Sequence, residues 1–388
     1  MKNNRNKIGI LYVIGQSEYI GGAEKESLYI INNLDRRKFR PTVILPKHGP
    51  VEKLFRASHI HVKVIGQSRS KIFKKTVSEL IIAYKINIIH LVTLREFEFK
   101  VAAAARINRI PCVWHMHFVY KNVYPHTSNI QLKRILACVC LLSEKVIACS
   151  NYVRRQFEEL GLGDKVVTIL NGVDFGFLKN SSDLQRKKLR KKLGIKANDF
   201  FVTMAGRFLP QKRHADFIDA AKIVNRAFPD VKFIAEGSFA DKRYLSQLLE
   251  RAEGRIVING FKKNISSLIN AADLIVMPSI GEGFGLAVLE AMSCAKAVVA
   301  VRSGGIPEIV TDKTAILVSP KAPEKMAAAI IKLARNRNMA GKFGKQGRKR
   351  SEKLFDIKLA VKRLQELYLE IYRDSFYFRR RKSCFAGE

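Results

Sequence analysis

The sequence predicts an α/β protein made of two doubly wound units, each with a parallel sheet that helices cover on both faces. Three observations lead to this prediction. Short apolar runs alternate with helix-like segments, the runs lack the polar alternation of half-exposed strands, and the pattern stops once before it begins again. The 388 residues of the chain are enough for about two to three domains.

The first part of the chain begins with a buried-type strand at 7–15, a glycine-containing loop and a helical pattern. Further strand-like runs follow, with helix-like stretches such as KVAAAARIN and YVRRQFEEL between them; the runs are PTVILP, VKVIG, INIIHLV, PCVWHMH and KVIACS. We therefore expect a first Rossmann-like domain over residues 1–180.

A polar, strongly basic segment at 181–198 interrupts this pattern, and we expect it to be a linker. The alternation then resumes in FFVTMAG, VKFIAEG, RIVING, DLIVMPS, KAVVAV and TAILVS, which predicts a second domain over 199–354. Apolar residues at helical spacing follow in 355–388, ahead of a basic tail, FRRRK. We expect this last segment to be a helix that packs back on the first domain. Two such sheets in tandem place a cleft between their carboxyl-end loops, where open α/β sheets bind ligands.

The charge of the chain is far from balanced. Lys and Arg number 70 against 34 Asp and Glu, a net charge of +36 with a pI near 10.1, and the excess lies mainly in 1–200 and 301–388. Such a chain is expected to bind polyanions, namely nucleic acid, an anionic membrane surface or phosphate-bearing substrates, although solvated basic faces explain any single run equally well. No nucleic-acid-binding motif interleaves aromatic residues with the basic runs, so we expect no nucleic acid partner.

The cysteines and the hydropathy of the chain indicate where in the cell the protein is expected to work. The six cysteines form no CxxC pair, which predicts reduced thiols and a cytoplasmic protein. No run approaches the roughly 18–20 apolar residues that span a bilayer, and the apolar run at 8–14 is too short for a signal peptide. Membrane contact is therefore expected to be peripheral. The segment 130–142, apolar with Lys133 and Arg134, fits a helix lying against lipid and fits a buried core helix equally well.

The strongest local motif is PSIGEGFGLAVLE, at 278–290. Glu282 falls in a glycine-rich turn after a strand, and Glu290 falls one to two turns into the following helix. The amides of Gly283, Phe284 and Gly285 would point out of the helix start, where the dipole favours anions or hydroxyl oxygens. A loop acid and a surface ion pair are the alternatives for the two glutamates. The turn differs from a dinucleotide fingerprint in its third glycine.

Two other loops are candidates for phosphate binding. Arg207 and Lys212 lie on one loop after the strand FFVTMAG, where two cations could hold a diphosphate, although solvent-facing charge also explains them. Gly21 and Gly22 follow the first strand and would let the backbone approach a phosphate closely. There is no P-loop and no G-x-S-x-G elbow, which argues against P-loop nucleotide hydrolases and serine hydrolases.

The sequence HMH places His115 and His117 on one face of a strand. No third metal ligand is visible nearby, so we expect no metal site. A histidine hydrogen-bonded in the core or cleft fits better, and one at a strand end can serve in acid–base chemistry.

The motif at 278–292, PSIGEGFGLAVLEAM, resembles the E-x7-E element of retaining GT-B glycosyltransferases, above all glycosyltransferase family 4. Further segments resemble elements of the same family and follow its order over residues 15–320. They are IGGAEK for the Gly-Gly loop, PCVWHMH for the P-x-x-x-x-x-H segment, VIACSNYVRRQFEELG with VVTILNGVD, GRFLPQK for the diphosphate clamp, and RSGGIPEIV for the GG-x-P-E-[IL] segment.

The resemblance implies roles for the residues above. Glu290 would hold the ribose hydroxyls of a nucleotide-sugar, and Glu282 with the neighbouring amides would bind the donor sugar. Arg207 and Lys212 would neutralise the diphosphate, joined by the backbone of Gly21 and Gly22. His117 would face the reacting sugar. The domain at 1–180 would be the acceptor side, and the domain at 199–354 would bind the nucleotide-sugar. The family has glycine and proline where this chain has Ala295 and Ala297, a departure that lies beyond both glutamates and concerns packing.

The expected function is retaining, hexosyltransferase-type transfer from a UDP- or GDP-sugar to a glycan or lipid-linked acceptor in cell-surface polysaccharide or glycolipid synthesis. The nucleotide-sugar is a co-substrate, and neither a cofactor nor a metal is expected. The alternatives are a GT-B sugar-nucleotide epimerase and a basic nucleic-acid-binding protein. A phosphorylase would need a pyridoxal-phosphate lysine motif, which is not found.

Overall fold

The computed structural model describes residues 7–66, 70–124, 126–178, 182–239, 241–254, 256–260 and 265–384. The chain divides into two compact units: Met1–Gly172 together with Ile357–Glu388, and Val173–Asp356. We call them the first unit and the second unit. Both are parallel sheets covered by helices, so the predicted α/β class with two Rossmann-like domains is confirmed.

The first unit contains a seven-stranded parallel sheet in the order β3-β2-β1-β4-β5-β6-β7. Its strands are β1 (Ile8–Val13), β2 (Phe39–Leu45), β3 (Val62–Val64), β4 (Ile86–Leu91), β5 (Cys112–Met116), β6 (Lys145–Ala148) and β7 (Val166–Thr168). The strand order reverses between the neighbours β1 and β4, so the loops at the carboxyl ends of these strands diverge to opposite sides.

Helices cover both faces of this sheet. They are α1 (Gly22–Asn33), α2 (Pro50–Ala57), α3 (Ser70–Ala83), α4 (Glu96–Ile107), α5 (Tyr120–Val123), α6 (Asn129–Leu142), α7 (Asn151–Glu158) and α16 (Ile357–Cys384), with a 3-10 turn, η1 (Gly163–Lys165). Val113 belongs to the buried cluster that β1, α1, α2 and α16 share. Its neighbour Trp114 points to the opposite face and packs on Phe99 of α4, with ring centroids 4.7 Å apart.

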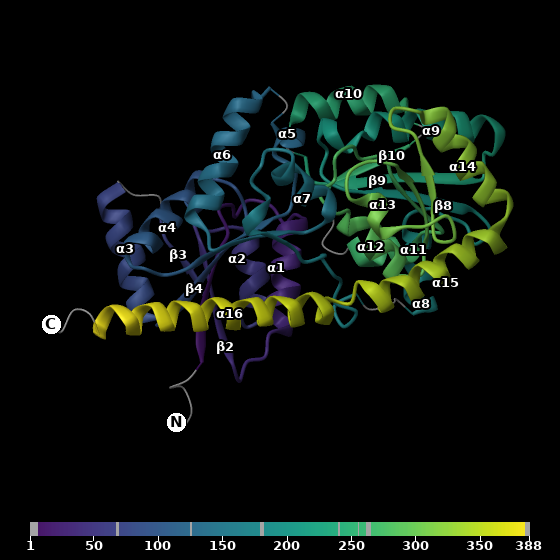
Figure 1. The fold of residues 1–388 in the computed structure, drawn as a ribbon. Helices are drawn as coiled ribbons and strands as arrows, with labels where there is room; N and C mark the ends of the chain where they lie inside the picture. Colours follow the sequence, from purple (N-terminus) through teal and green to yellow (C-terminus); the bar gives the residue numbers. More distant parts are fainter. Residues whose placement is uncertain are drawn as a thin grey trace. The chain divides into compact units, whose positions relative to one another are not determined.

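The last helix, α16, is part of the first unit although it ends the chain. It lies beside α1, and its buried Val361, Leu364, Leu367, Tyr368 and Ile371 join the core of that unit. Figure 1 shows it as the long yellow helix that runs past α1 and α2. The side chains of the basic tail, and that of Cys384, lie outside the described part of the chain.

The second unit contains a six-stranded parallel sheet in the order β10-β9-β8-β11-β12-β13. Its strands are β8 (Phe200–Ala205), β9 (Val231–Gly237), β10 (Val257–Gly260), β11 (Leu274–Met277), β12 (Ala297–Val301) and β13 (Ile316–Val318). Its helices are α8 (Asp183–Lys192), α9 (His214–Ala227), α10 (Lys242–Ala252), α11 (Ile265–Ala271), α12 (Leu286–Ser293), α13 (Ile306–Ile309), α14 (Pro323–Arg335) and α15 (Arg337–Leu354), with a 3-10 turn, η2 (Pro210–Lys212).

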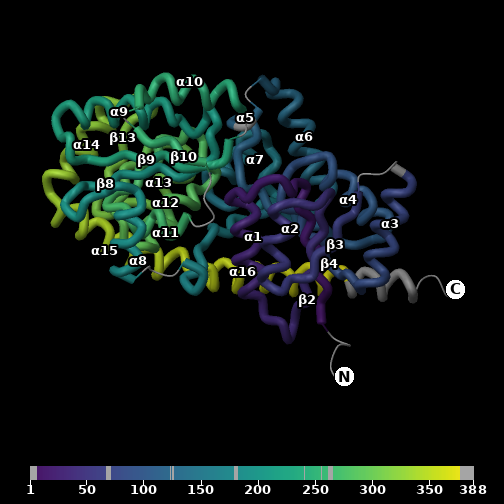
Figure 2. Tube along the Cα trace, turned by 180° about the vertical axis from the view of Figure 1, so that it is seen from behind, coloured from purple at the N-terminus to yellow at the C-terminus, as the bar shows by residue number. Residues whose placement is uncertain are grey.

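The structure differs from the expected linker at 181–198. Ser182 caps helix α8 through its side chain, and two of the basic residues of this helix, Arg186 and Arg190, contact the rest of the unit. Arg190 is buried and donates to the carbonyl oxygen of Ala271 and to Asp273, at 3.1 and 3.0 Å. Helix α8 therefore belongs to the second unit, where it lies beside α11 in both views (Figures 1 and 2). Basic composition alone did not reveal that two arginines, Arg186 and Arg190, form ion pairs with the partly buried Asp273.

The expected domain limits of 180, 199 and 354 also differ from the observed division, which falls after Gly172 and after Asp356. The chain passes from one unit to the other twice, after Gly172 and after Asp356. A backbone hydrogen bond joins these two segments, in which the amide of Val173 donates to the carbonyl oxygen of Phe355 at 2.9 Å. No helix within the described residues has the length and apolar character needed to cross a membrane.

Candidate active site

The candidate site of the second unit lies at the carboxyl edge of its sheet. The strand order reverses between the neighbours β8 and β11, and the loops that follow β8, β11 and β12 meet at that edge. Such a reversal is the usual ligand position in an open α/β sheet. The second-unit site residues predicted from the sequence come from the loops after β8 and β11 or from helix α12.

The loop after β8 carries both predicted cations. Arg207 lies two residues after the end of β8 and is half-buried, and Lys212 ends the 3-10 turn η2. Arg213, at φ +57°, then turns the chain into α9 and pairs with Asp216 at 2.6 Å. The pairing of Arg213 with Asp216 leaves Lys212 as the cation that reaches across to the next loop.

Lys212 and Glu282 form a close ion pair. The Lys212 Nζ lies 2.5 Å from Glu282 Oε1, and both side chains are about one-fifth exposed, at 21% and 19%. Burial acts to raise the pKa of Glu282, but the charge and hydrogen bond of Lys212, a hydrogen bond from Ser279 and the charge of Arg207 together hold that pKa below its usual value. The structure therefore joins the two motifs, and Glu282 is ionised at neutral pH.

The glycine-rich turn around Glu282 is held in place by its neighbours. The amide of Ile280 donates to the Gln211 carbonyl oxygen at 3.0 Å, and the amide of Gly281 donates to Ser303 Oγ at 2.9 Å. The amide of Gly305 donates to the Glu282 carbonyl oxygen at 2.9 Å. The two loops can come this close only because residue 304 has no side chain. A Cβ on Gly304 would lie 2.1 Å from the carbonyl oxygen of Glu282.

The sequence assigned no role to Ser279, Ser303, Gly304 or Gly305. Ser303, Gly304 and Gly305 lie within RSGGIPEIV, a motif that does not indicate which loop they contact. They contact the turn at Gly281 and Glu282, about twenty residues earlier in the sequence, so only the fold reveals these contacts.

Helix α12 begins as predicted. Gly285 is its N-cap at φ +107°, a left-handed conformation that favours glycine, and the amides of Val288 and Leu289 donate to its carbonyl oxygen. Phe284 is buried against Phe355, with ring centroids 5.8 Å apart. Glu290, in the second turn of the helix, is only 2% exposed, so it is not the surface ion-pair residue that its sequence alone allowed.

In the first unit, Gly21 is the N-cap of α1 and Gly22 is the first helical residue. The amide of Gly21 donates to Glu24 Oε2 at 2.7 Å. The sequence suggested that the paired glycines expose amide donors to a phosphate. For Gly21 the structure shows that a carboxylate of the same helix already accepts this hydrogen bond.

His117 follows β5 and ends a column of buried rings. Its ring centroid lies 4.0 Å from that of His115, which lies 5.4 Å from that of His90. His90 Nδ1 is 2.6 Å from the Tyr368 hydroxyl of α16, which is 2.8 Å from the Tyr12 hydroxyl. The sequence placed His115 and His117 on one face correctly but gave no sign of His90, Tyr12 or Tyr368.

Both ring nitrogens of His117 are buried and have no hydrogen-bond partner within the described part of the chain. Burial lowers the pKa of His117 to about 3, so the imidazole is neutral at pH 7. Among the described residues, no group of three or more His, Cys, Asp or Glu side chains is arranged to hold a metal ion.

These groups define what the arrangement can do. Two cations and a fixed carboxylate at a sheet edge suit a ligand that has both an anionic group and hydroxyl groups. A neutral, buried imidazole can accept or donate a single hydrogen bond to a ligand without carrying charge.

The chain matches two family descriptions in sequence. "Glycosyltransferase Family 4" matches residues 20–177, and "Glycosyl transferases group 1" matches residues 185–350. The two matches together span most of both units and include every predicted site residue.

Curated and solved relatives agree with these matches. The chain is 28% identical over 313 residues to an Escherichia coli UDP-Gal:alpha-D-GlcNAc-diphosphoundecaprenol alpha-1,3-galactosyltransferase, covering 76% of this chain and 79% of that protein. The crystal structure of Anabaena HepE in complex with UDP and glucose superposes with a TM-score of 0.83 at 26% identity, covering 92% of this chain and 98% of that one. The same protein in complex with UDP-glucose gives a TM-score of 0.83.

Proposed function

Because this chain is a GT-B glycosyltransferase of the family 4 type, we propose that it transfers a hexose from a UDP-sugar, with retention of anomeric configuration, to a glycan or lipid-linked acceptor. The Lys212–Glu282 pair beside Arg207 carries the proposal, since it joins phosphate-binding and hydroxyl-binding groups at one sheet edge. UDP and UDP-glucose in the HepE structures favour uridine over guanosine, the other base that the sequence left open.

The residues take the following roles in this proposal. Arg207 and Lys212 neutralise the diphosphate, and Glu282, with the amides of Gly283, Phe284 and Gly285, binds hydroxyls of the donor sugar. The buried carboxylate of Glu290 accepts the ribose hydroxyls. His117 of the first unit hydrogen-bonds to the transferred sugar as a neutral imidazole, and the loop of Gly21 and Gly22 approaches the phosphates.

The chemistry explains why cations matter here. Breaking the anomeric C–O bond leaves positive charge on the sugar and extra negative charge on the departing diphosphate. Cations aimed at that diphosphate stabilise the transition state more than the bound donor. When the diphosphate binds, Lys212 exchanges its contact with Glu282 for a phosphate oxygen, and Glu282 becomes available to the sugar. The reaction therefore needs no metal in this proposal.

Donor binding is tested by thermal unfolding with UDP, GDP and their glucose conjugates. We expect UDP to raise the Tm of the parent protein and of the control Glu324→Ala, whose carboxylate is exposed on α14, but not that of Glu290→Gln. An equal UDP shift in Glu290→Gln would contradict the role of Glu290, and no shift with any nucleotide would contradict the proposed function.

Turnover is tested with the cation variants. Arg207→Ala and Lys212→Ala are expected to lower kcat by about 10²-fold, as for loss of one preorganised charge donor. Unchanged rates would contradict the proposal that Arg207 and Lys212 bind the diphosphate. A chelator should leave the parent rate unchanged, and the anomeric configuration of the product, read by NMR, checks retention.

We also propose that the protein works in the cytoplasm, bound peripherally to an anionic membrane surface, in the synthesis of cell-surface polysaccharide or glycolipid. Helix α6 supports this proposal. It buries Leu132, Leu136 and Val139, while Ile130 and Leu141 are 68% and 63% exposed beside the exposed Lys133 and Arg134. A helix that combines exposed apolar and basic side chains suits the interface of an anionic leaflet.

Vesicle co-sedimentation tests this surface. Binding to phosphatidylglycerol vesicles should weaken as salt rises and be lost in Lys133→Glu/Arg134→Glu, while Lys342→Glu/Lys345→Glu on α15, with the same change in charge, should bind like the parent. Equal loss in both double variants would show a diffuse charge effect, and salt-independent or absent binding would contradict membrane association.

A further inference from the structure

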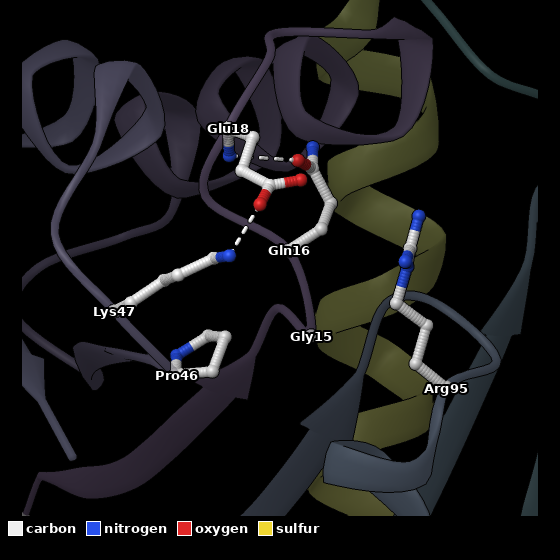
Figure 3. A pocket seen from close by; sticks show the side chains of 6 residues that line it. All are labelled: Gly15, Gln16, Glu18, Pro46, Lys47 and Arg95. Atoms are coloured by element: carbon white, nitrogen blue, oxygen red, sulfur yellow. Dashed lines mark hydrogen bonds and ion pairs between the residues drawn. The ribbon is translucent and has the colours of Figure 1, made fainter. Parts of the chain in front are cut away.

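A cavity of about 360 Å³ opens in the first unit, lined by none of the residues proposed for the donor. This volume lies within the roughly 300–1,000 Å³ of small-molecule sites. Its lining residues are Gly15, Gln16, Glu18, Pro46, Lys47 and Arg95 (Figure 3). We call it the first-sheet cavity.

The first-sheet cavity lies where the fold of this unit favours a ligand. Residues 15–18 follow β1, residues 46–47 follow β2, and Arg95 follows β4. These strands are neighbours in the order β2-β1-β4, across the reversal of strand order. The cavity is therefore at the carboxyl edge and the switch point of the first sheet, as the candidate donor site is in the second.

Hydrogen bonds from neighbouring residues fix the loops that line the cavity. The buried carboxyl of Glu98 accepts from the amide of Gly15 at 2.6 Å and from the hydroxyl of Thr93, so it joins the loops after β1 and β4. Gln16 closes the next turn, since its side chain donates to the Tyr19 carbonyl oxygen at 2.6 Å and accepts from the Glu18 amide at 3.2 Å. These hydrogen bonds fix the positions of Gly15 and Gln16 in the lining of the cavity.

Its charges are two cations and one carboxylate. Lys47 pairs with Glu18, and Figure 3 shows the lysine extending to that carboxylate with Arg95 on the other side of the view. Arg95 donates to the Tyr19 hydroxyl at 3.0 Å, and no carboxylate among the described residues forms an ion pair with it. The hydrogen bond and charge of Lys47, and the charge of Arg95, hold the pKa of Glu18 below its usual value, so both cations act on this position.

We propose that the first-sheet cavity binds the acceptor, and that the acceptor bears a phosphate or carboxylate held by Lys47 and Arg95 while Glu18 and Gln16 bind adjacent hydroxyls. The proposal deepens and rests on the proposed function, because it names the class of the second substrate. Charge complementarity favours it: the cavity has one more cation than it has carboxylates, and an anionic group restores the balance.

Glu18 has a defined part in this exchange. Without a ligand it neutralises Lys47, and an incoming anion takes its place on the lysine. The released carboxylate then accepts hydrogen bonds from sugar hydroxyls. A neutral sugar offers Lys47 nothing to replace Glu18, so the cavity selects against uncharged acceptors.

The test uses the full chain with UDP at saturating concentration, so that the donor site is occupied. Ligand-observed NMR titrations compare glucose 1-phosphate, glucuronic acid and glucose at low salt. We expect at least one charged sugar to bind about tenfold or more tightly than glucose, and Lys47→Gln or Arg95→Gln to weaken its binding by a similar factor, as for loss of one charge-assisted hydrogen bond. Which charged sugar binds tells a phosphate from a carboxylate.

Two further variants sharpen the result. Lys63→Gln removes an exposed lysine of β3 that does not line the cavity, and it should bind like the parent. Glu18→Gln should bind inorganic phosphate more tightly than the parent, because Lys47 no longer has a competing carboxylate. Equal binding of glucose and both charged sugars, equal weakening by Lys63→Gln, or weaker phosphate binding in Glu18→Gln would each overturn the proposal.

The same samples separate this proposal from the one on which it rests. UDP binding without preference for a charged sugar contradicts the acceptor class and leaves the donor site intact. Absence of UDP binding contradicts the proposed function itself.

Discussion

Ala295 has a backbone conformation that favours glycine. Its φ is +54°, and it is the residue after the C-cap of helix α12. The amides of Ala295 and Lys296 donate to the carbonyl oxygens of Met292 and Ala291 at 2.9 and 3.0 Å, which is the paired ending that usually has glycine at this position. A residue with a Cβ costs about 1–2 kcal/mol there. The chain thus carries strain at the position where the family it resembles has glycine.

We expect Ala295→Gly to raise the free energy of unfolding by roughly 0.5–1 kcal/mol, because relief of the strain exceeds the added entropy of the unfolded chain. Urea denaturation measures the change. Ala297→Gly, in the buried strand β12, is the matched control and should destabilise the protein. A loss of stability in Ala295→Gly as large as in the control would refute the strain at this position.

At the same scale, the sequence singled out the candidate residues of the proposed donor site but not their contacts. Glu282, Glu290, Arg207 and Lys212 stand out because each lies in a short motif after a strand. That Lys212 pairs with Glu282 was not predicted, since seventy positions separate them. Arg95 and Lys47 of the first-sheet cavity stand in no motif, and only the neighbouring ends of their strands bring them together.

Helix α16 is attached to the first sheet by a buried polar chain as well as by apolar packing. The Tyr368 hydroxyl bonds to Tyr12 of β1 and to His90 of β4, and all three side chains are fully buried. Burial raises the pKa of both tyrosines, so their hydroxyls keep their protons. One hydroxyl therefore joins the last helix of the chain to two central strands.

Tyr368→Phe is expected to lower the free energy of unfolding of the first unit by about 1–3 kcal/mol, because two buried polar groups lose their partner. Adding Tyr12→Phe should cost less than the sum of the single changes, since both remove the same hydrogen bond. Chemical denaturation of the two single variants and the double variant measures the coupling. Strict additivity would show that the hydroxyls do not interact.

Elements were predictable where an apolar run marks a buried strand. The predicted strand runs coincide with β1–β6 and β8–β13, because a parallel strand covered on both faces is apolar throughout. Strand β7 was not predicted as a strand, since at Val166–Thr168 it is short and lies at the edge of the sheet. Helix α8 was taken for a linker because its contacts to the second unit are made by arginines, which the sequence shows only as charge.

Over the whole molecule, buried imidazoles make stability depend on pH. Burial lowers the pKa of His90, His117 and His214 to about 3, and each titrates near its ordinary value of 6.5 once unfolded. The unfolded chain then binds more protons, so this stability is present above pH 6.5 and is lost as the pH falls towards 3. Glu98 acts oppositely, because burial raises its pKa from 4.5 to about 7 and its contribution is lost as the pH rises through 7.

The histidines outnumber Glu98, so Tm should be highest near neutral pH and fall steadily below pH 6.5. A thermal unfolding series from pH 8 to pH 4 measures this. His214→Gln should flatten the acid side of the profile, while His126→Gln, an exposed histidine, should leave it unchanged. An acid profile that is the same in both variants would contradict the assignment to buried imidazoles.

The place of α16 also sets an order of events on the ribosome. The second unit is one continuous stretch of chain and can fold as soon as it has emerged from the ribosome. The core of the first unit is incomplete until helix α16 has been translated, because that helix contributes buried side chains to it. At about 5–20 residues per second, the nascent chain spends roughly 10–40 s between Gly172 and Ile357. Throughout that interval Tyr12, His90 and the apolar side chains around them are open to chaperones. The half of the molecule that is synthesised first is the half that is completed last.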